Sequence, residues 1–119
     1  MGKKTLEELQ RKVQTFCEER DWDQFHGPKD LAIGVITEAS ELLEHFRFLS
    51  EEESLAILSD PKQKEEIEEE LADVFFFLLR FTQRFDIDLT MALLRKIEKS
   101  ALKYPVEKAR GKNTKYTKL

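Results

Sequence analysis

Apolar side chains recur at every third or fourth position along most of this sequence, which is the period of an amphipathic α-helix. The pattern predicts helices over residues 6–20, 28–48, 51–58, 61–85 and 91–103. No segment of the sequence alternates apolar and polar residues as a half-buried β-strand does. We therefore expect an all-α fold, a bundle with four main helices.

Residues that satisfy free backbone groups mark the expected helix boundaries. Residues 5–8 and 50–53 each place a hydroxyl residue three positions before a glutamate, which is the pattern of a capping box. Pro28 and Pro61 suit the first position of a helix, and Tyr104-Pro105 ends the last long helix. The tail beyond it is expected to hold one short turn of helix before Gly111.

The second predicted helix carries an acid inside its apolar stripe. Leu31, Val35, Leu42 and Phe46 share one face, and Glu38 falls among them. A carboxylate there loses much of its hydration and needs a partner. Glu41 lies one turn further, at the edge of the stripe. Gly34, one turn before Glu38, leaves room for a close neighbour.

The longest predicted helix repeats this arrangement. Its expected inward face is the series Ile67, Leu71, Val74, Leu78, Phe81 and Phe85. Glu70 and Asp73 flank that face, one turn before Phe77. Phe75, Phe76 and Leu79 cover most of the remaining circumference, so the second half of the helix is expected to be buried all round. A lone four-helix bundle rarely buries a helix so fully, which indicates an oligomer.

The sequence thus holds two pairs of acids, EASE at 38–41 and ELAD at 70–73, each spaced by one helical turn. If the two helices pack antiparallel, four carboxylates converge and need either protons or cations. Oxygen ligands favour Mg²⁺, with Mn²⁺ as an alternative. Such spacings also occur on solvated helix faces, so a purely structural role stays open. A di-iron centre would require Glu-x-x-His pairs, which neither motif contains.

Composition and charge narrow the class of protein. A chain of 119 residues suits one domain, 1–119, and the net charge of -4 argues against general nucleic-acid binding. Residues 95–119 nevertheless hold nine Lys or Arg and two Glu, so the end of the chain, with its basic tail at 105–119, suits an anion. Cys17 is expected to be a small buried hydrophobe. The sequence shows neither a signal peptide nor a run of roughly 20 apolar residues, which favours a cytoplasmic protein without a membrane span.

Several short motifs, taken in order, resemble the MazG-like all-α nucleoside triphosphate pyrophosphohydrolases, closest to the dCTP pyrophosphatase branch. They are RDWDQFH at 20–26, P-x-x-L at 28–31, EASELLEHF at 38–46, EELADV at 69–74, DL at 88–89, KYP at 103–105 and KYTKL at 115–119. Each motif is weak alone, but their order and spacing are specific. The resemblance covers the chain from about Thr5 to Leu119.

The resemblance implies a reaction and a set of metal ligands. The family hydrolyses a nucleoside triphosphate between its α and β phosphates, giving the monophosphate and pyrophosphate, with Mg²⁺ held by an E-x-x-E…E-x-x-D set. Carried over by position, the ligands are Glu38, Glu41, Glu70 and Asp73. Glu38 and Glu41 are then the catalytic candidates, and Glu41 is the first candidate for the base that activates water.

The resemblance also implies a nucleotide pocket. Its candidate residues are Trp22, Phe25, His26, Phe48, Lys96, Ser100, Tyr104, Lys112 and Lys115. Trp22 and Phe25 would pack against the base, but they are equally explained as core aromatics. His26 would donate to the base or a phosphate, and Phe48 stands where relatives place an aromatic over the base. A basic surface tail explains Lys112 and Lys115 nearly as well.

Departures from the family pattern leave the base preference open. Thr37 precedes Glu38 where broader relatives often have a second glutamate, Asp23 replaces a frequent asparagine, and Ser100 stands where an asparagine is common. The sequence therefore predicts a cytoplasmic homo-oligomer, a tetramer, that removes dCTP or modified pyrimidine dNTPs from the nucleotide pool. The alternative is a non-catalytic bundle of the same fold that senses nucleotides.

Overall fold

The structure, a computed structural model, describes residues 2–119. It divides into two compact units, one ending at Ile87 and one spanning Asp88–Leu119, and each is described by itself. Within the described residues every regular element is a helix, which confirms the predicted all-α class. No helix among residues 2–119 is long and apolar enough to cross a membrane.

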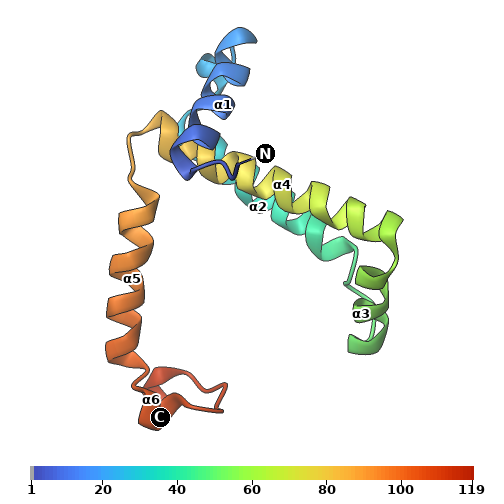
Figure 1. The fold of residues 1–119 in the computed structure, drawn as a ribbon, viewed down its shortest axis with the longest axis vertical. Helices are drawn as coiled ribbons and strands as arrows, with labels where there is room; N and C mark the ends of the chain where they lie inside the picture. The colour runs from blue at the N-terminus through green and yellow to red at the C-terminus, as the bar shows by residue number, and fades with distance from the viewer. Residues whose placement is uncertain (1) are drawn as a thin grey trace. The chain divides into compact units, whose positions relative to one another are not determined.

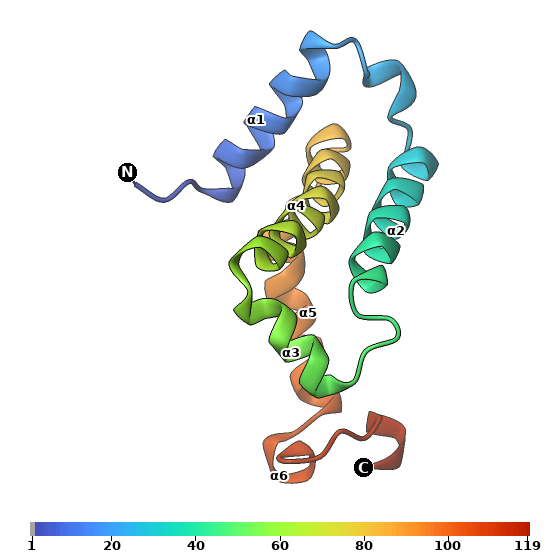
Figure 2. The same cartoon turned by 90° about the vertical axis from the view of Figure 1, so that its right-hand side faces the viewer.

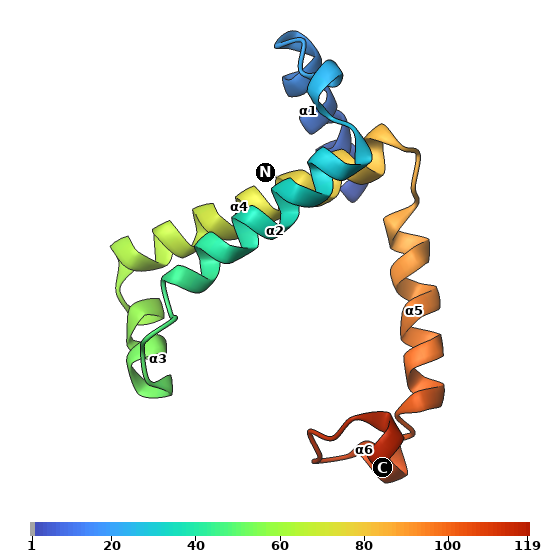
Figure 3. The same cartoon turned by 180° about the vertical axis from the view of Figure 1, so that it is seen from behind.

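The first unit is built around two long helices that lie side by side. Its elements are α1 (Leu6–Glu19), the 3₁₀ turn η1 (Asp23–Phe25), α2 (Pro28–Glu44), α3 (Glu51–Ser59) and α4 (Pro61–Arg84). Helices α2 and α4 run antiparallel along most of their length (Figures 1 and 3). Helix α1 packs against the second half of α4, and α3 packs near its start (Figure 2).

The helices of this unit begin where the capping residues predict. The Ser50 hydroxyl accepts the Glu53 N–H while Glu53 accepts the Ser50 N–H, which completes the predicted capping box. Asp60 caps α4 ahead of Pro61. At α1 the Thr5 hydroxyl accepts the Glu8 N–H, but the Glu8 carboxylate lies 4.0 Å from Lys4 Nζ, so only half of that box forms.

Helix α2 is shorter than predicted, because it ends at Glu44 rather than near Phe48. The N–H groups of His45 and Phe46 bond to carbonyls three residues back, which tightens the chain out of the α-helix. Phe46 therefore lies beyond the helix and is half-buried. Phe48 lies in the following turn with 85% of its surface exposed.

The predicted inward face of α4 is partly wrong. Ile67 is buried as expected, but Leu71 is 51% exposed and Leu78 is 38% exposed. The buried residues of the second half are instead Leu79, Arg80 and Thr82. The reason is that α1 and the loop after it cover a different side of α4 from α2, so the buried face turns along the helix.

Gly34 sets how closely α2 approaches α4. A Cβ atom added there would lie 2.4 Å from Cδ1 of the Phe77 ring, so the ring occupies the space that any other residue would fill. This contact confirms the expectation that Gly34 admits a close neighbour. Because Glu38 follows Gly34 by one turn and Asp73 precedes Phe77 by one turn, the contact holds the two acid-bearing segments together.

The second unit contains α5 (Leu89–Lys103), α6 (Val106–Ala109) and the 3₁₀ turn η2 (Tyr116–Lys118). Asp88 caps α5 by accepting the Met91 N–H. The predicted short turn before Gly111 is α6. Gly111 then adopts a φ of +71°, a left-handed conformation that glycine adopts without strain.

Candidate metal centre and its surroundings

The four acids of the two motifs converge, as the helical pattern predicts. Glu38 and Glu41 from α2 and Glu70 and Asp73 from α4 each offer one carboxylate oxygen, and these oxygens all lie within 4.8 Å of one another. Two of the acids, Glu38 and Glu70, are half-buried, and the other two are exposed. The antiparallel helices therefore form a cluster that is partly buried and partly open to solvent.

The pKa of Glu38 shows that the crowding of carboxylates disfavours its ionised form. Burial, then a hydrogen bond with Glu41, and then the charges of Glu41, Asp73 and Glu70 raise the pKa of Glu38 to about 7. Like charges and lost hydration both disfavour its ionised form. Near neutral pH the metal-free cluster thus holds a proton that a cation can displace.

Glu70 has an oxygen with no partner. Its Oε1 lies 3.5 Å from Nε2 of His45, whereas its Oε2 is buried and accepts no hydrogen bond from the described residues. A buried carboxylate oxygen without a partner is costly, so it points to a ligand. Oxygen donors in this number suit a hard divalent cation such as Mg²⁺ or Mn²⁺.

A second charged group lies further along α4, where it anchors the loop that connects α1 to α2. Arg80 is completely buried, and its guanidinium donates to Asp23, to Nδ1 of His26 (2.8 Å) and to Oε1 of Gln83 (2.6 Å). The hydrogen bond from Arg80 lowers the pKa of Asp23. Burial, and then the Arg80 charge, lower the pKa of His26.

The aromatic residues of this loop divide between packing and exposure. Trp22 packs edge-to-face on Phe16, with ring centroids 5.6 Å apart, and on His26, at 6.2 Å. Phe16 also packs on Phe76 of α4 and is 40% exposed. Phe25 is 62% exposed and free to contact a ligand. Trp22 thus serves at least as an anchor of the loop, and its contact with a base stays a prediction.

The other predicted pocket residues are less constrained. Phe48 is exposed, and the Arg47 guanidinium lies 4.9 Å from the centre of its ring. The remaining candidates lie in the second unit: Lys96, Ser100, Tyr104, Lys112 and Lys115. There the Tyr104 and Tyr116 rings pack edge-to-face at 5.9 Å, and the Ser100 carbonyl accepts the Tyr104 N–H. Contact of these residues with a nucleotide stays a prediction.

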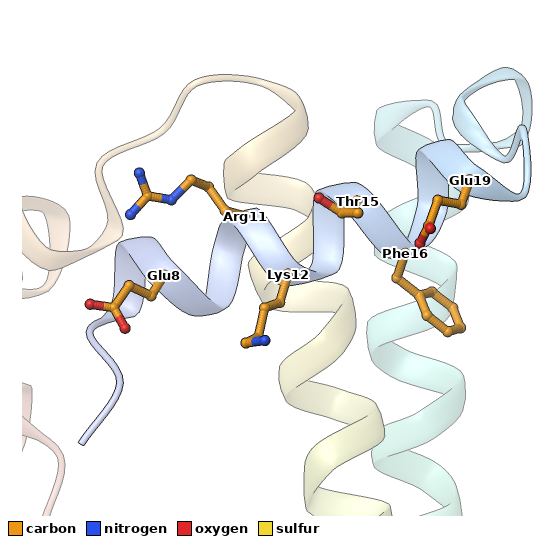
Figure 4. Close-up of a pocket in the computed structure, with 6 residues that line it drawn as sticks. All are labelled: Glu8, Arg11, Lys12, Thr15, Phe16 and Glu19. Carbon is orange, nitrogen blue, oxygen red and sulfur yellow. The ribbon is translucent and has the colours of Figure 1, made fainter. Parts of the chain in front are cut away.

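Two hollows of the first unit lie apart from the acid cluster. One follows α1 and is lined by Glu8, Arg11, Lys12, Thr15, Phe16 and Glu19 (Figure 4). All six come from one helix, and Arg11 and Lys12 point to opposite sides, so no charges converge there. The other is an apolar groove of about 580 Å³ between α2 and α4, where Ala39, Leu42, Leu71, Phe75 and Leu78 are among the lining residues.

Sequence reasoning missed two residues near these sites, Arg80 and His45. Arg80 interrupts the apolar run FFFLLRF at 75–81, and a lone cation in a buried segment is a signal for a paired charge. His45 follows the EASE motif by one turn, but nothing in the sequence marks it as the neighbour of Glu70. Neither residue belonged to the expected pocket.

Comparison with known proteins identifies the family. Residues 33–119, which include all four clustered acids, match the MazG-like family. The chain belongs to the MazG-like family. The dCTP pyrophosphatase 1 of Rattus norvegicus is 37% identical over 115 residues, which cover 97% of this chain and 68% of that protein. The human protein of the same name is 36% identical over the same shares of the two chains.

A solved structure supports the fold of this MazG-like chain. A pyrophosphatase from Archaeoglobus fulgidus DSM 4304 superposes with a TM-score of 0.80 and 37% sequence identity. The match covers 88% of this chain and 96% of the archaeal one. The resemblance read from the motifs is therefore confirmed at the level of the family and the fold.

Proposed function

We propose that this MazG-like protein is a divalent-cation-dependent hydrolase that cleaves nucleoside triphosphates between the α and β phosphates. Water supplies the oxygen of the new bond, and the products are the monophosphate and pyrophosphate. The observation that carries the proposal is the cluster of Glu38, Glu41, Glu70 and Asp73, whose oxygens lie within 4.8 Å of one another. The names of the relatives support a hydrolase that acts on nucleotide pyrophosphate bonds.

The four acids would hold Mg²⁺, or Mn²⁺ in its place. A bound divalent cation supplies Lewis acidity at the phosphoryl oxygens and offsets the charge that develops there. Glu70 brings the buried oxygen that lacks a partner, and Glu38 brings a carboxyl that releases its proton as the cation binds. The exposed Glu41 carboxylate is the base that we propose for accepting a proton from the attacking water.

The substrate we propose is dCTP or a modified pyrimidine deoxynucleoside triphosphate. The support is the name shared by the mammalian relatives, dCTP pyrophosphatase 1. Phe25 and Phe48 are exposed, and either of them offers aromatic surface for a base. Removal of such nucleotides from the cytoplasm would keep the precursor pool clean.

We also propose that the protein works as a homo-oligomer, a tetramer. Leu71, Phe75 and Leu78 are between 38% and 51% exposed, and together with Ala39 and Leu42 they line the apolar groove along α2 and α4. An apolar surface of this kind is typical of an interface. Light scattering tests the proposal: the native protein should have the mass of four chains, and Phe75→Lys should lower it.

The activity is tested by measuring pyrophosphate release from a panel of dNTPs and NTPs, with Mg²⁺, with Mn²⁺ and with a chelator. Glu38→Gln and Asp73→Asn should both abolish release, and Glu65→Gln, an exposed acid at the start of α4, is the matched control. Release of phosphate in place of pyrophosphate would contradict cleavage at the α–β bond. An absence of turnover on every nucleotide would favour the non-catalytic bundle.

A further inference from the structure

The hydrogen bond from Arg80 shows which ring nitrogen of His26 carries the proton. A guanidinium has five N–H donors, no acceptor, and stays charged at any pH at which a protein folds. Its Nε donates to Nδ1 of His26 at 2.8 Å, so Nδ1 must hold a lone pair. The imidazole is then neutral, and its one proton sits on Nε2.

We propose that Arg80 is a positioning residue that holds His26 as the neutral Nε2–H tautomer, so that the ring presents one N–H donor to the base of the bound nucleotide. The inference rests on the proposed function, because it needs a nucleotide in the site. It assigns a task to Arg80, a group that takes no part in holding the cation.

The Nε2 atom is free to meet a ligand. Within residues 2–119 the single buried side-chain oxygen or nitrogen without a hydrogen bond is Oε2 of Glu70. His26 Nε2 has no hydrogen bond in that part of the chain, so it reaches solvent. The edge-to-face contact with Trp22 and the bond from Arg80 together fix the plane of the ring. A donor with a fixed direction selects for the position of its acceptor.

The position along α4 suits the base end of a nucleotide. Arg80 follows Asp73 by two helical turns, about 10 Å along the axis. If the phosphates lie at the acids and the nucleotide extends toward the end of α4, the base reaches the segment beside Arg80 and His26. His26 then lies at a distance from the reacting phosphorus, where it serves binding and not the chemical step.

The charges around His26 agree with a neutral ring. Arg80 and Arg84 from α4 disfavour its protonation, whereas Asp23 from η1 and Asp30 from α2 favour it. Burial is the largest cause and lowers the pKa of His26, and the cations add to it. Asp23 accepts from Arg80, so its charge is already satisfied.

The experiment combines nitrogen-15 NMR of the histidine side chains with steady-state kinetics on the full chain. In the wild type, Nε2 of His26 should carry the proton, and the ring should stay neutral below the usual histidine pKa. Arg80→Met should let the ring take up a proton at a higher pH than in the wild type, although burial still lowers its pKa. It should also raise KM about five- to tenfold, with kcat nearly unchanged. Gln83→Met is the matched control, since it removes another partner of Arg80 and leaves the His26 contact in place.

A double-mutant cycle separates positioning from general damage to the fold. In His26→Gln the amide supplies an N–H donor that has no tautomer to fix, so adding Arg80→Met should raise KM less than it does in the wild type. Equal increases in KM in both backgrounds would overturn the proposal. Arg80→Lys keeps an N–H donor for Nδ1 of His26, so it should raise KM less than Arg80→Met does.

The inference and the proposed function fail in different ways. A proton on Nδ1 of His26 in the wild type overturns the inference, whatever the activity. If no nucleotide is hydrolysed, the proposed function falls, and NMR alone decides the inference. The probe is then dCTP with Mg²⁺: a shift of the His26 Nε2–H resonance supports the contact with the base, and an unchanged resonance refutes it.

Discussion

Helix α4 carries two groups of charge, and they differ in how they are satisfied. Near its middle, Glu70 and Asp73 lie close to the acids of α2, and Oε2 of Glu70 is buried without a hydrogen bond. Toward its end, Arg80 is more deeply buried, yet each of its three nitrogens donates to a partner. In the protein alone, the acid cluster has an oxygen without a hydrogen-bond partner, whereas every nitrogen of the Arg80 guanidinium has one.

The contrast separates a site from a structural anchor. A buried charge that has all its partners stabilises one conformation and has nothing left to offer a ligand. A cluster of like charges with a free oxygen destabilises the metal-free fold, and it recovers that cost when a cation binds. In this chain the unsatisfied buried oxygen lies in the cluster for which we propose the chemistry, whereas the deeply buried Arg80 lies outside it.

The largest expected effect comes from neutralising one acid of the cluster. Glu38→Gln should lower the rate of pyrophosphate release on the order of a thousandfold, because it removes one charged ligand. The same change should raise the melting temperature of the metal-free protein at pH 8, because burial and like charges disfavour the ionised form of Glu38. Glu65→Gln, at an exposed position of α4, should change neither quantity. A fall in melting temperature for Glu38→Gln would contradict the view that the acid cluster destabilises the metal-free fold.

Removing the buried Arg80 guanidinium should lower the stability of the protein, whereas neutralising Glu38 should raise that of the metal-free protein. Arg80→Met leaves Asp23, His26 and Gln83 without their shared donor, and it should lower the free energy of unfolding by about 3 kcal/mol. Urea unfolding measures the change. Arg84→Met, one turn later and exposed, should cost less than about 0.5 kcal/mol. Equal losses for the two variants would show that the network is not an anchor.

A smaller effect is expected from the packing that joins the two helices. The added Cβ of Gly34→Ala would meet the Phe77 ring at 2.4 Å, so α2 and α4 must separate at a cost of about 2 kcal/mol. The acids move apart with the helices, so Mn²⁺ affinity, measured by calorimetry, should fall.

Two variants sharpen the Gly34 prediction. At Gly27 an added Cβ lies 3.4 Å from an oxygen of Asp30, nearly an ordinary contact, so Gly27→Ala should leave Mn²⁺ affinity unchanged. Phe77→Leu should restore part of the affinity in the Gly34→Ala protein, because it shortens the side chain that clashes. Unchanged affinity in Gly34→Ala alone would show that this contact does not place the acids.

The acid cluster could be predicted from the sequence because it depends on the spacing of residues within each helix. Glu38 falls inside an apolar stripe, and the pairs at 38–41 and 70–73 are each spaced by one turn, so antiparallel helices must bring them together. Pro28, the capping box at 50–53 and Pro61 predicted the starts of α2, α3 and α4 for the same reason. These features depend on residues that are close together in the sequence.

The Arg80 network could not be predicted because it is not local. Arg80 is separated from His26 by 54 positions, and the pairing depends on how the loop after α1 folds back onto α4. The same loop and α1 cover the side of α4 that holds Leu79, which is why Leu78 was wrongly placed inside. Helical periodicity locates a face, but it does not say which neighbour covers it.

The smallest expected effect is a pH dependence that differs between the two groups. The pKa of Glu38 is raised to about 7, so its stabilising contribution is complete below the ordinary glutamate value and is lost as pH rises through 7. The metal-free protein should therefore lose about 1 kcal/mol of unfolding free energy through this group between pH 6 and pH 8, after allowance for solvent screening. Asp23, with its lowered pKa, loses its contribution only in acid, so it does not change in this window.

His26 acts in the opposite direction at the lower edge of that window, so Glu38→Gln serves as the reference. The lowered pKa of His26 means that stability falls as pH drops below the usual histidine value, and this effect is present in both proteins. The difference in unfolding free energy between wild type and Glu38→Gln, measured in urea with a chelator, then isolates Glu38. It should grow from pH 6 to pH 8 and shrink when Mg²⁺ is added at pH 8. A difference that does not change with pH would mean that Glu38 is already ionised at pH 6. The surroundings of the acid cluster would then stabilise its charge as well as those of Arg80 do.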